Sequence, residues 1–300
     1  MSNRFSSTIR TAISFTAFAI AATGASAQGL NIESDGADRI RLAGQLPTFT
    51  QQVAAASCAV TSGVDVDEAY DVLERATEQF DRYIVALRDG DEELHILRPE
   101  DNRRILVDIE HVMAEWMEIH GAIDAILVDG HDVESAHHID DHNLKLLELT
   151  SILAAAISGK YAVPFAISAR DVMLLELAGR QLMLTQKMAK DACEIWTGYH
   201  AADAKDDLRV TMAYFENSLV ALHSGLPALG IIPAPNDVIR ADLEALLNRW
   251  SILKPNLQTL VEGGELNEDQ KYEVFHDLEI ELAELEHLLV DYKEYAERAH

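Results

Sequence analysis

The stretch "LELAGRQLMLTQKMAK", residues 175–190, has a divergent copy, "IRLAGQLPTFTQQVAA", at residues 40–55. Both copies keep Ala-Gly and Thr-Gln, and they are 135 residues apart. The same shift aligns "FDRYIVALRDG", residues 80–90, with "FENSLVALHSG", residues 215–225, and further on it drifts only to 133, where "LVDG" meets "LVEG". So small a drift over a whole unit indicates an internal duplication.

Each unit is predicted to form four helices. Apolar residues recur at helical spacing, as at Leu243, Leu246, Leu247 and Trp250, and glycines and prolines separate the periodic segments. We expect helices over residues 38–60, 65–88, 100–128, 141–160, 168–198, 203–223, 236–261 and 267–297. The expected N-caps are Asp65, Asp101, Ser168, Asn236 and Asn267. Short connections favour an all-α fold of two tandem antiparallel four-helix bundles, with a single array of eight helices as the alternative.

The N-terminus has the pattern of a secretory signal peptide. Arg4 and Arg10 precede or flank a short apolar run, and Ala25-Ser26-Ala27 offers small residues for cleavage before Gln28. The apolar run is too short to span a bilayer, and no later segment is long and apolar enough to do so. We therefore expect a leader over residues 1–27, helical units over 28–163 and 164–300, and a periplasmic or secreted protein without a membrane span after cleavage. An uncleaved N-terminal anchor is the alternative.

The charge of the chain excludes one class of partner. Twenty-four Lys and Arg residues face 51 Asp and Glu residues, which gives a net charge of −27. Removing the leader takes away Arg4 and Arg10 and no acid, so this value becomes −29. A surplus of this size repels phosphate backbones, and we expect no nucleic-acid partner.

The repeated phrase resembles the first helix of a family of sensor domains, those of type IV pilus chemotaxis transducers (PilJ-type) and nitrate/nitrite sensor kinases (NarX-type). The family phrase runs approximately I-N-x-A-G-x-x-R-M-x-S-x-R. The second unit matches it at Leu177, Ala178, Gly179, Gln181, Met183, Thr185, Gln186 and Lys187, and the first at Leu42, Ala43, Gly44, Thr50 and Gln51. The resemblance implies a four-helix extracytoplasmic sensor module that pairs through its first helix and holds a small ligand near the pairing axis.

One departure from the family bears on the ligand. The position whose Arg holds the anion in the nitrate sensors falls on Leu182, and on Pro47 in the first unit. Neither side chain can donate the forked hydrogen bonds that a planar oxyanion requires. The polar groups that the phrase offers between the two first helices are Arg180, Gln181, Thr185, Gln186, Gln45, Thr50 and Gln51. We expect a neutral or weakly charged ligand there, and a kink or restart of the first helix at Pro47.

The two cysteines occupy equivalent positions of the repeat. Cys58 lies eleven residues past Pro47, and Cys193 lies eleven past Leu182, which is about three helical turns. Each cysteine therefore shares a helix face with the family's ligand position. If that face meets its copy in an oxidising compartment, Cys58 and Cys193 form a disulfide. Two buried free thiols are the alternative.

Other motifs give weaker signals. The segment "HDVESAHHIDDH", residues 131–142, combines imidazole and carboxylate groups that suit transition metals, but the second unit lacks a copy, so a solvated connection is the simpler interpretation. No nucleophile elbow, zinc-protease helix, phosphate loop or dinucleotide fingerprint occurs. We expect neither enzymatic activity nor a cofactor nor a metal.

Together these patterns favour a free-standing sensory module in which two PilJ/NarX-like bundles of one chain form a pseudo-dimer. We expect it to bind a small ligand and to signal through a membrane-bound sensor or transducer protein. The alternatives are a structural or adaptor protein that has lost its ligand and a metal-binding protein that uses residues 131–142.

Overall fold

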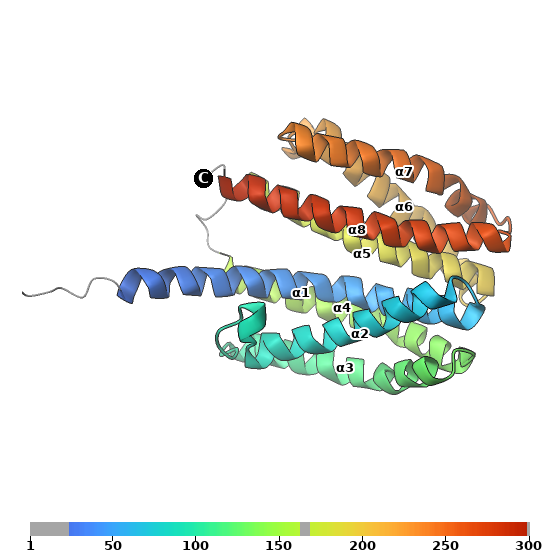
Figure 1. The fold of residues 1–300 in the computed structure, drawn as a ribbon, viewed down its shortest axis with the longest axis horizontal. Helices are drawn as coiled ribbons and strands as arrows, with labels where there is room; N and C mark the ends of the chain where they lie inside the picture. Colours follow the sequence, from blue (N-terminus) through green and yellow to red (C-terminus); the bar gives the residue numbers. More distant parts are fainter. Residues whose placement is uncertain (1–23, 163–168, 299–300) are drawn as a thin grey trace, which may run out of the picture.

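The computed structural model describes residues 24–162 and 169–298. Within these ranges the chain forms eight α-helices and no β-strand, arranged as two antiparallel four-helix bundles (Figure 1). The first bundle contains α1 (Gly24–Ser62), α2 (Val66–Asp89), α3 (Arg103–Val128) and α4 (Val133–Tyr161). The second contains α5 (Ala169–Thr197), α6 (Ala201–Ser224), α7 (Asp237–Val261) and α8 (Glu268–Arg298). The predicted fold class is confirmed.

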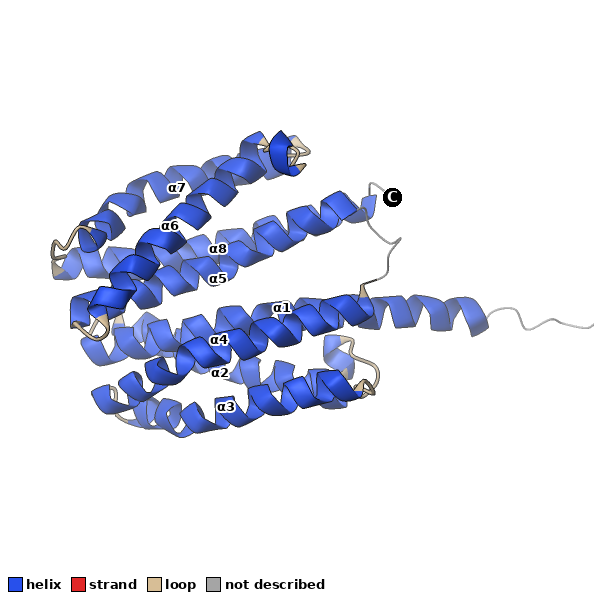
Figure 2. Ribbon diagram, turned by 180° about the vertical axis from the view of Figure 1, so that it is seen from behind, coloured by secondary structure: helices blue, strands red, loops and turns tan. Residues whose placement is uncertain are grey.

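The two bundles meet through their first helices. α1 and α5 pack against each other, and each also packs against the last helix of its own bundle, α4 and α8 respectively. Figure 2 shows the resulting order, with α1, α4, α5 and α8 in the middle and the pairs α2–α3 and α6–α7 on opposite outer sides. The duplicated first helices therefore lie at the centre of the molecule.

The duplication is visible residue by residue. The turn after α2 contains a short 3-10 helix, Glu92–Leu94, and the turn after α6 contains its copy, Pro227–Leu229, at a shift of 135. At the same shift, Gly90 and Gly225 both have a positive φ, as do Asp65 and His200 before α2 and α6. Sequences that differ in most positions thus keep the same backbone turns.

Each bundle core contains one aromatic pair that the repeat aligns. Phe80 stacks on Trp116 with ring centroids 4.0 Å apart, and Phe215 contacts Trp250 at 5.0 Å. All four side chains are buried, and they join the second helix of each bundle to the third. Burial of these large apolar rings is a main source of the stability of each bundle.

Several boundaries differ from the prediction. α4 begins at Val133 rather than at residue 141, because Asp132 caps it by accepting a hydrogen bond from the Ser135 amide. α1 begins at Gly24 rather than at residue 38 and continues through Pro47 without a break, so the expected restart there is wrong. Pro47 removes one backbone hydrogen bond of the helix, and the packing of α1 against α2, α4 and α5 offsets this loss.

The predicted caps are partly confirmed. Asn236 caps α7 by accepting from the Ile239 amide, and Asn267 exchanges hydrogen bonds with Gln270 at the start of α8. Asn102, not Asp101, caps α3. Asp65 stands at the N-cap position of α2 but makes no side-chain cap bond. Ser168 lies outside the described residues.

The expected leader covers residues 1–27, of which 1–23 lie outside the described residues. The expected cleavage point after Ala27 falls in the first turn of α1. Among the helices of residues 24–162 and 169–298, none combines the length and apolar character that crossing a membrane requires.

Candidate functional site

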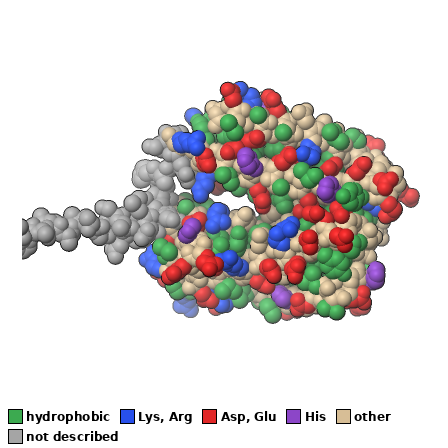
Figure 3. Space-filling view, in the orientation of Figure 1, with side chains coloured by type: hydrophobic (Ala, Val, Ile, Leu, Met, Phe, Trp, Pro, Cys, Tyr) green, Lys and Arg blue, Asp and Glu red, His purple; other side chains and the backbone are tan. Residues whose placement is uncertain are grey.

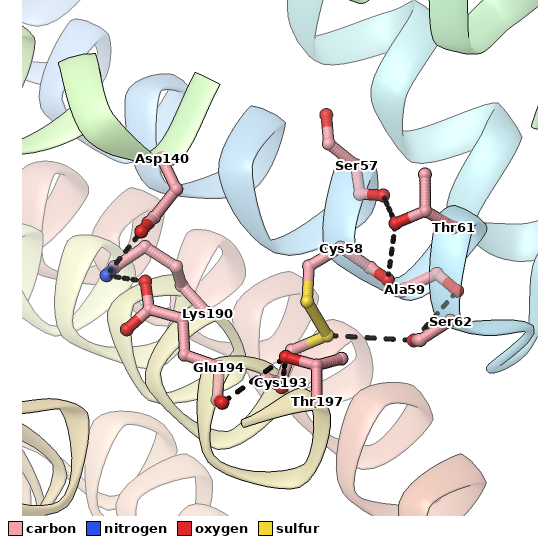
Figure 4. Close-up of a disulfide and its surroundings, with 10 residues drawn as sticks. All are labelled: Ser57, Cys58, Ala59, Thr61, Ser62, Asp140, Lys190, Cys193, Glu194 and Thr197. Carbon is pink, nitrogen blue, oxygen red and sulfur yellow. Dashed lines mark hydrogen bonds and ion pairs between the residues drawn. A yellow bond between two sulfur atoms is a disulfide. The ribbon is translucent and has the colours of Figure 1, made fainter. Parts of the chain in front are cut away.

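α1 and α5 are covalently joined near their C-terminal ends. Cys58 and Cys193 form the expected disulfide, with their Cα atoms 6.1 Å apart, inside the range that disulfides span (Figure 4). Cys193 is almost fully buried. The bond therefore fixes which faces of α1 and α5, the helices that contain the repeated phrase, are turned toward each other.

A buried network of charges lies beside this disulfide, where α4 meets α5 (Figure 4). The Lys190 ammonium contacts Asp140 of α4 and the carboxylates of Asp191 and Glu194 on its own helix. Burial acts to lower the pKa of Lys190, but the three carboxylates outweigh it and raise that pKa. Lys190 therefore stays charged and serves as a cross-bundle anchor.

Three of the predicted ligand groups are occupied by protein partners. The Thr50 and Thr185 hydroxyls donate to the carbonyls of Pro47 and Gln181 on their own helices, at 2.8 and 2.7 Å. Gln51 Nε2 donates to Asn143 Oδ1 of α4 at 2.8 Å. These side chains are fully buried, so the structure places them inside the packing of the bundles.

The equivalent of Gln51 in the second unit, Gln186, differs in its hydrogen bonding. Gln186 on α5 is 0% exposed, and neither its Nε2 nor its Oε1 has a hydrogen-bond partner of normal geometry. Its amide faces the Glu279 carboxylate of α8, which Gln52 of α1 also approaches. Glu279 Oε1 likewise lacks a partner. We call Gln52, Gln186 and Glu279 the three-helix junction.

Glu279 lies largely within the protein and keeps some contact with solvent. Its residue as a whole is partly accessible, although its Oε1 atom is buried. Burial raises its pKa to about 7, against the opposing effect of the Gln186 amide, Arg75 and the Gln52 amide.

The remaining predicted groups are dispersed. Arg180 is exposed, so it lies outside the buried junction. Gln181 is fully buried and donates to the Leu177 carbonyl of its own helix, while Gln45 is partly buried. Leu182 and Pro47, at the family's anion position, are both buried. Aliphatic groups therefore fill that position.

The histidine-rich segment belongs to helix α4 and its start, not to a free connection. The His137 ring stacks on Tyr199 of the other bundle, His138 contacts the Glu118 carbonyl, and His142 contacts Glu115 at 2.7 Å. These three imidazole groups therefore contact different protein partners and do not face a common metal position.

A different trio in the described part of the chain could hold a metal ion. Asp242 of α7 with His287 and Asp291 of α8 place one ligand atom each within 4.8 Å of the others. Two carboxylates and an imidazole suit a divalent transition metal. Sequence reasoning missed this trio because its members come from two helices.

The bundles also exchange a reciprocal pair of contacts that the repeat relates. Asp65, before α2, lies 3.6 Å from His276 of α8, and His200, before α6, lies 3.2 Å from Asp141 of α4. At the shift of 135 each aspartate aligns with a histidine. The contact is thus kept with the two residue types exchanged, and it holds each last helix against the opposite bundle.

Sequence reasoning also missed Glu279. It stands in the acidic last helix, where the sequence alone indicates a solvated face that includes Glu281, Glu284 and Glu286. That interpretation is wrong for Glu281, which is 0% exposed. A 3.6-residue period places Glu279 about one helical turn after Phe275 and one before Leu282, both of them buried. That position is the only sequence signal that could have singled it out.

One comparison with known proteins is informative. The family described as "Type IV pili methyl-accepting chemotaxis transducer N-term" matches residues 30–142 and, a second time, residues 166–275. The two segments make up more than half of the chain and coincide with the two copies of the repeated phrase, which confirms the resemblance seen in them. No curated protein matches the chain.

Proposed function

We propose a sensory function for this protein on the premise that the chain belongs to the family of type IV pilus methyl-accepting chemotaxis transducer N-terminal domains. In this proposal the two bundles, residues 28–163 and 164–300, form a pseudo-dimer in the periplasm. A small ligand binds in the seam between α1 and α5, at the three-helix junction. Binding is passed on to a membrane-bound sensor or transducer protein.

One observation carries the proposal. Gln186 is fully buried, and neither of its amide atoms has a partner at normal hydrogen-bond geometry, whereas Nε2 of its repeat equivalent Gln51 donates to Asn143 Oδ1 and only Oε1 of Gln51 lacks a partner. An unsatisfied buried amide costs about 1–3 kcal/mol, so a ligand that supplies the missing partners recovers that free energy. Support also comes from the position of the junction between the paired first helices, which is where the family resemblance implies a ligand.

Ligand-dependent thermal melting of the mature protein tests the proposal. A ligand at 100 times its Kd should add about 2.7 kcal/mol of stability. The Gln186→Met variant, which keeps the volume and removes the amide, should lose the shift, while Arg180→Ala should keep it because Arg180 is exposed. A shift that survives Gln186→Met would place the ligand elsewhere.

A structural or adaptor protein without a ligand is the second candidate. The burial of Leu182 and Pro47 at the family's anion position favours it. This candidate predicts that no compound in a broad panel of small ions and metabolites changes the melting temperature.

The proposed location has its own test. If residues 1–27 are an export leader, the protein recovered from the periplasm should begin at Gln28, because Ala25-Ser26-Ala27 offers the small residues that cleavage requires. Mass analysis of the N-terminal peptide reads this directly. Exported protein that retains Met1 would contradict cleavage.

A further inference from the structure

The three-helix junction has a counterpart on the other side of the molecule. Glu279 of α8 faces Gln52 of α1 and Arg75 of α2. On the other side, α4 contacts Lys190 of α5 and His200, directly before α6. The shift of 135 aligns Gln52 with Lys187 and Glu279 with Leu144. The two junctions thus share a backbone and differ in their charges.

At the counterpart junction, the chain supplies its own cations. The Lys187 ammonium lies 3.0 Å from Asp191 Oδ2 and 2.8 Å from Asp207 Oδ2, and Lys190 lies 3.5 Å from Asp140 Oδ1. Leu144, in place of Glu279, is 74% exposed and takes no part. This junction is complete without any added molecule.

The three-helix junction contains the Glu279 carboxylate but has no counterpart of the Lys187 ammonium. Gln52 stands where Lys187 stands in the counterpart. The nearest cation is Arg75 of α2, which is exposed and makes no ion pair with Glu279 among the described contacts of the chain. Glu286, two helical turns further along α8, adds a second carboxylate, and Arg75 is the cation that opposes the rise of its pKa. The local charge is therefore negative and open to a cation.

The unsatisfied atoms define what a ligand must supply. Glu279 Oε1 and Gln186 Oε1 are acceptors without a donor at normal hydrogen-bond geometry, and the Gln186 amide, which faces the Glu279 carboxylate, contributes one donor, Nε2. An anion would face one donor and a carboxylate, whereas a primary ammonium group carries three donors and a positive charge. Both the local charge and the hydrogen-bonding atoms of the junction therefore favour a primary ammonium group.

We infer that the three-helix junction binds a small organic cation through its primary ammonium group, with Glu279 as the counter-ion and Gln186 as a hydrogen-bond acceptor. This inference rests on the proposed sensory function and names its ligand class.

Calorimetric titration of the mature protein tests the inference. The probes are ethanolamine and methylamine as primary ammonium ions, tetramethylammonium as a cation without N–H donors, acetamide as a neutral donor, and acetate as an anion. We expect the primary ammonium ions to bind and the other three not to. Glu279→Gln should weaken binding at least 10-fold. Glu273→Gln, the same change at an exposed position of α8, should leave it unchanged.

Wild-type protein provides a second readout if Glu279→Gln does not fold. Because burial raises the pKa of Glu279 to about 7, its carboxylate becomes fully ionised only above that pH, and ammonium binding should strengthen several-fold between pH 6 and pH 8. The other charged groups facing Glu279 are Arg75 and Glu68 of α2. Arg75→Ala should strengthen binding, since it removes the competing cation.

The possible outcomes distinguish the inferred ligand class from the proposed sensory function. Binding of acetate or acetamide that Gln186→Met abolishes would overturn the cation assignment and leave the sensory proposal standing. Ammonium binding that is unaffected by Glu279→Gln would overturn the assigned counter-ion. Absence of binding by any probe, together with no melting shift in the wider panel, would overturn both.

Discussion

At the scale of single residues, both bundles bury polar side chains, and Glu281 of the second bundle is a buried carboxyl group with little compensation. Glu281 is 0% exposed, and its nearest cation is Arg249 at 3.7 Å. Burial and the neighbouring Glu284 raise the pKa of Glu281 to about 8. The repeat aligns Glu281 with Leu146, a buried apolar residue of the first bundle. At this position the second unit therefore bears a desolvation cost that the first unit avoids.

Replacing the Glu281 carboxyl should change the free energy of unfolding by an amount that depends on pH. The folded pKa is raised, so the free energy of unfolding falls as pH rises from about 4.5 to about 8. Glu281→Gln has no proton to lose, and its advantage over wild type should grow from near zero at pH 4.5 to about 3–5 kcal/mol above pH 8. Urea unfolding across this range measures it. A difference that does not vary with pH would contradict the prediction, and Glu273→Gln is the exposed control.

At the scale of elements, the turns that close the helices carry strict backbone demands. Gly225 follows α6 with a φ of +81°, and a Cβ built there would lie 2.9 Å from Pro233 N. Gly90 occupies the equivalent turn with a φ of +88°. In contrast, a Cβ at Gly179 or Gly44 in the repeated phrase would meet nothing within 4 Å, and nothing in the structure explains why both are glycine.

These two kinds of glycine should respond to substitution with opposite signs. Gly225→Ala should cost about 1–3 kcal/mol, because alanine resists the positive φ and the added Cβ overlaps the Pro233 backbone. Gly179→Ala should stabilise by roughly 0.5–1 kcal/mol, since it removes a flexible residue from a helix interior. Chemical denaturation of both variants checks the pair. Equal effects would show that the turn conformation is not the controlling factor.

At the scale of the whole molecule, the two bundles are held together by the packing of α1 on α5, by one disulfide, and by ion pairs such as Lys190–Asp140 and the two reciprocal Asp–His contacts. The disulfide spans a sequence separation of 135 residues. It therefore constrains the unfolded chain strongly while fixing how α1 and α5 face each other. Acidic side chains are spread over both bundles on the face drawn in Figure 3, and the sequence contains 51 Asp and Glu residues against 24 Lys and Arg.

Removing the disulfide should lower stability markedly. Closing a loop of this length stabilises by about 4–5 kcal/mol in the chain-entropy model. Unfolding in urea with and without reductant measures the loss, and the chain has no cysteine besides Cys58 and Cys193. The Cys58→Ser/Cys193→Ser double variant should match the reduced protein and ignore reductant. A reductant effect in that variant would show that the loss has another source.

The whole charge distribution also bears on nitrate. Leu182 and Pro47 fill the family's anion position, Arg180 is exposed, and the nearby junction presents Glu279. Calorimetric titration with nitrate and nitrite at low salt should show no micromolar binding, for wild type and Arg180→Ala alike. Micromolar nitrate binding that Arg180→Ala abolishes would mean that the anion site has been retained in another form.

Much of the architecture followed from the sequence. Helical spacing of apolar residues, glycine and proline breaks and the 135-residue repeat determined eight helices in two equivalent bundles, because these signals are local or self-repeating. The equivalence of Cys58 and Cys193 also limited how the first helices could face each other. Helix starts were less certain, since Asp132 caps α4 ahead of a histidine-rich stretch that reads as a connection.

The tertiary structure alone decided which polar groups are satisfied. Gln51 and Gln186 are the same residue type at equivalent positions of the repeat, yet Gln51 Nε2 donates to Asn143 of α4, whereas the Gln186 amide faces Glu279 of α8. Likewise, Glu279 and Glu273 belong to one acidic helix, but only Glu279 lies against α1 and α5. The physical reason is that burial and hydrogen bonding depend on neighbours from other helices, which a pattern along one helix does not contain.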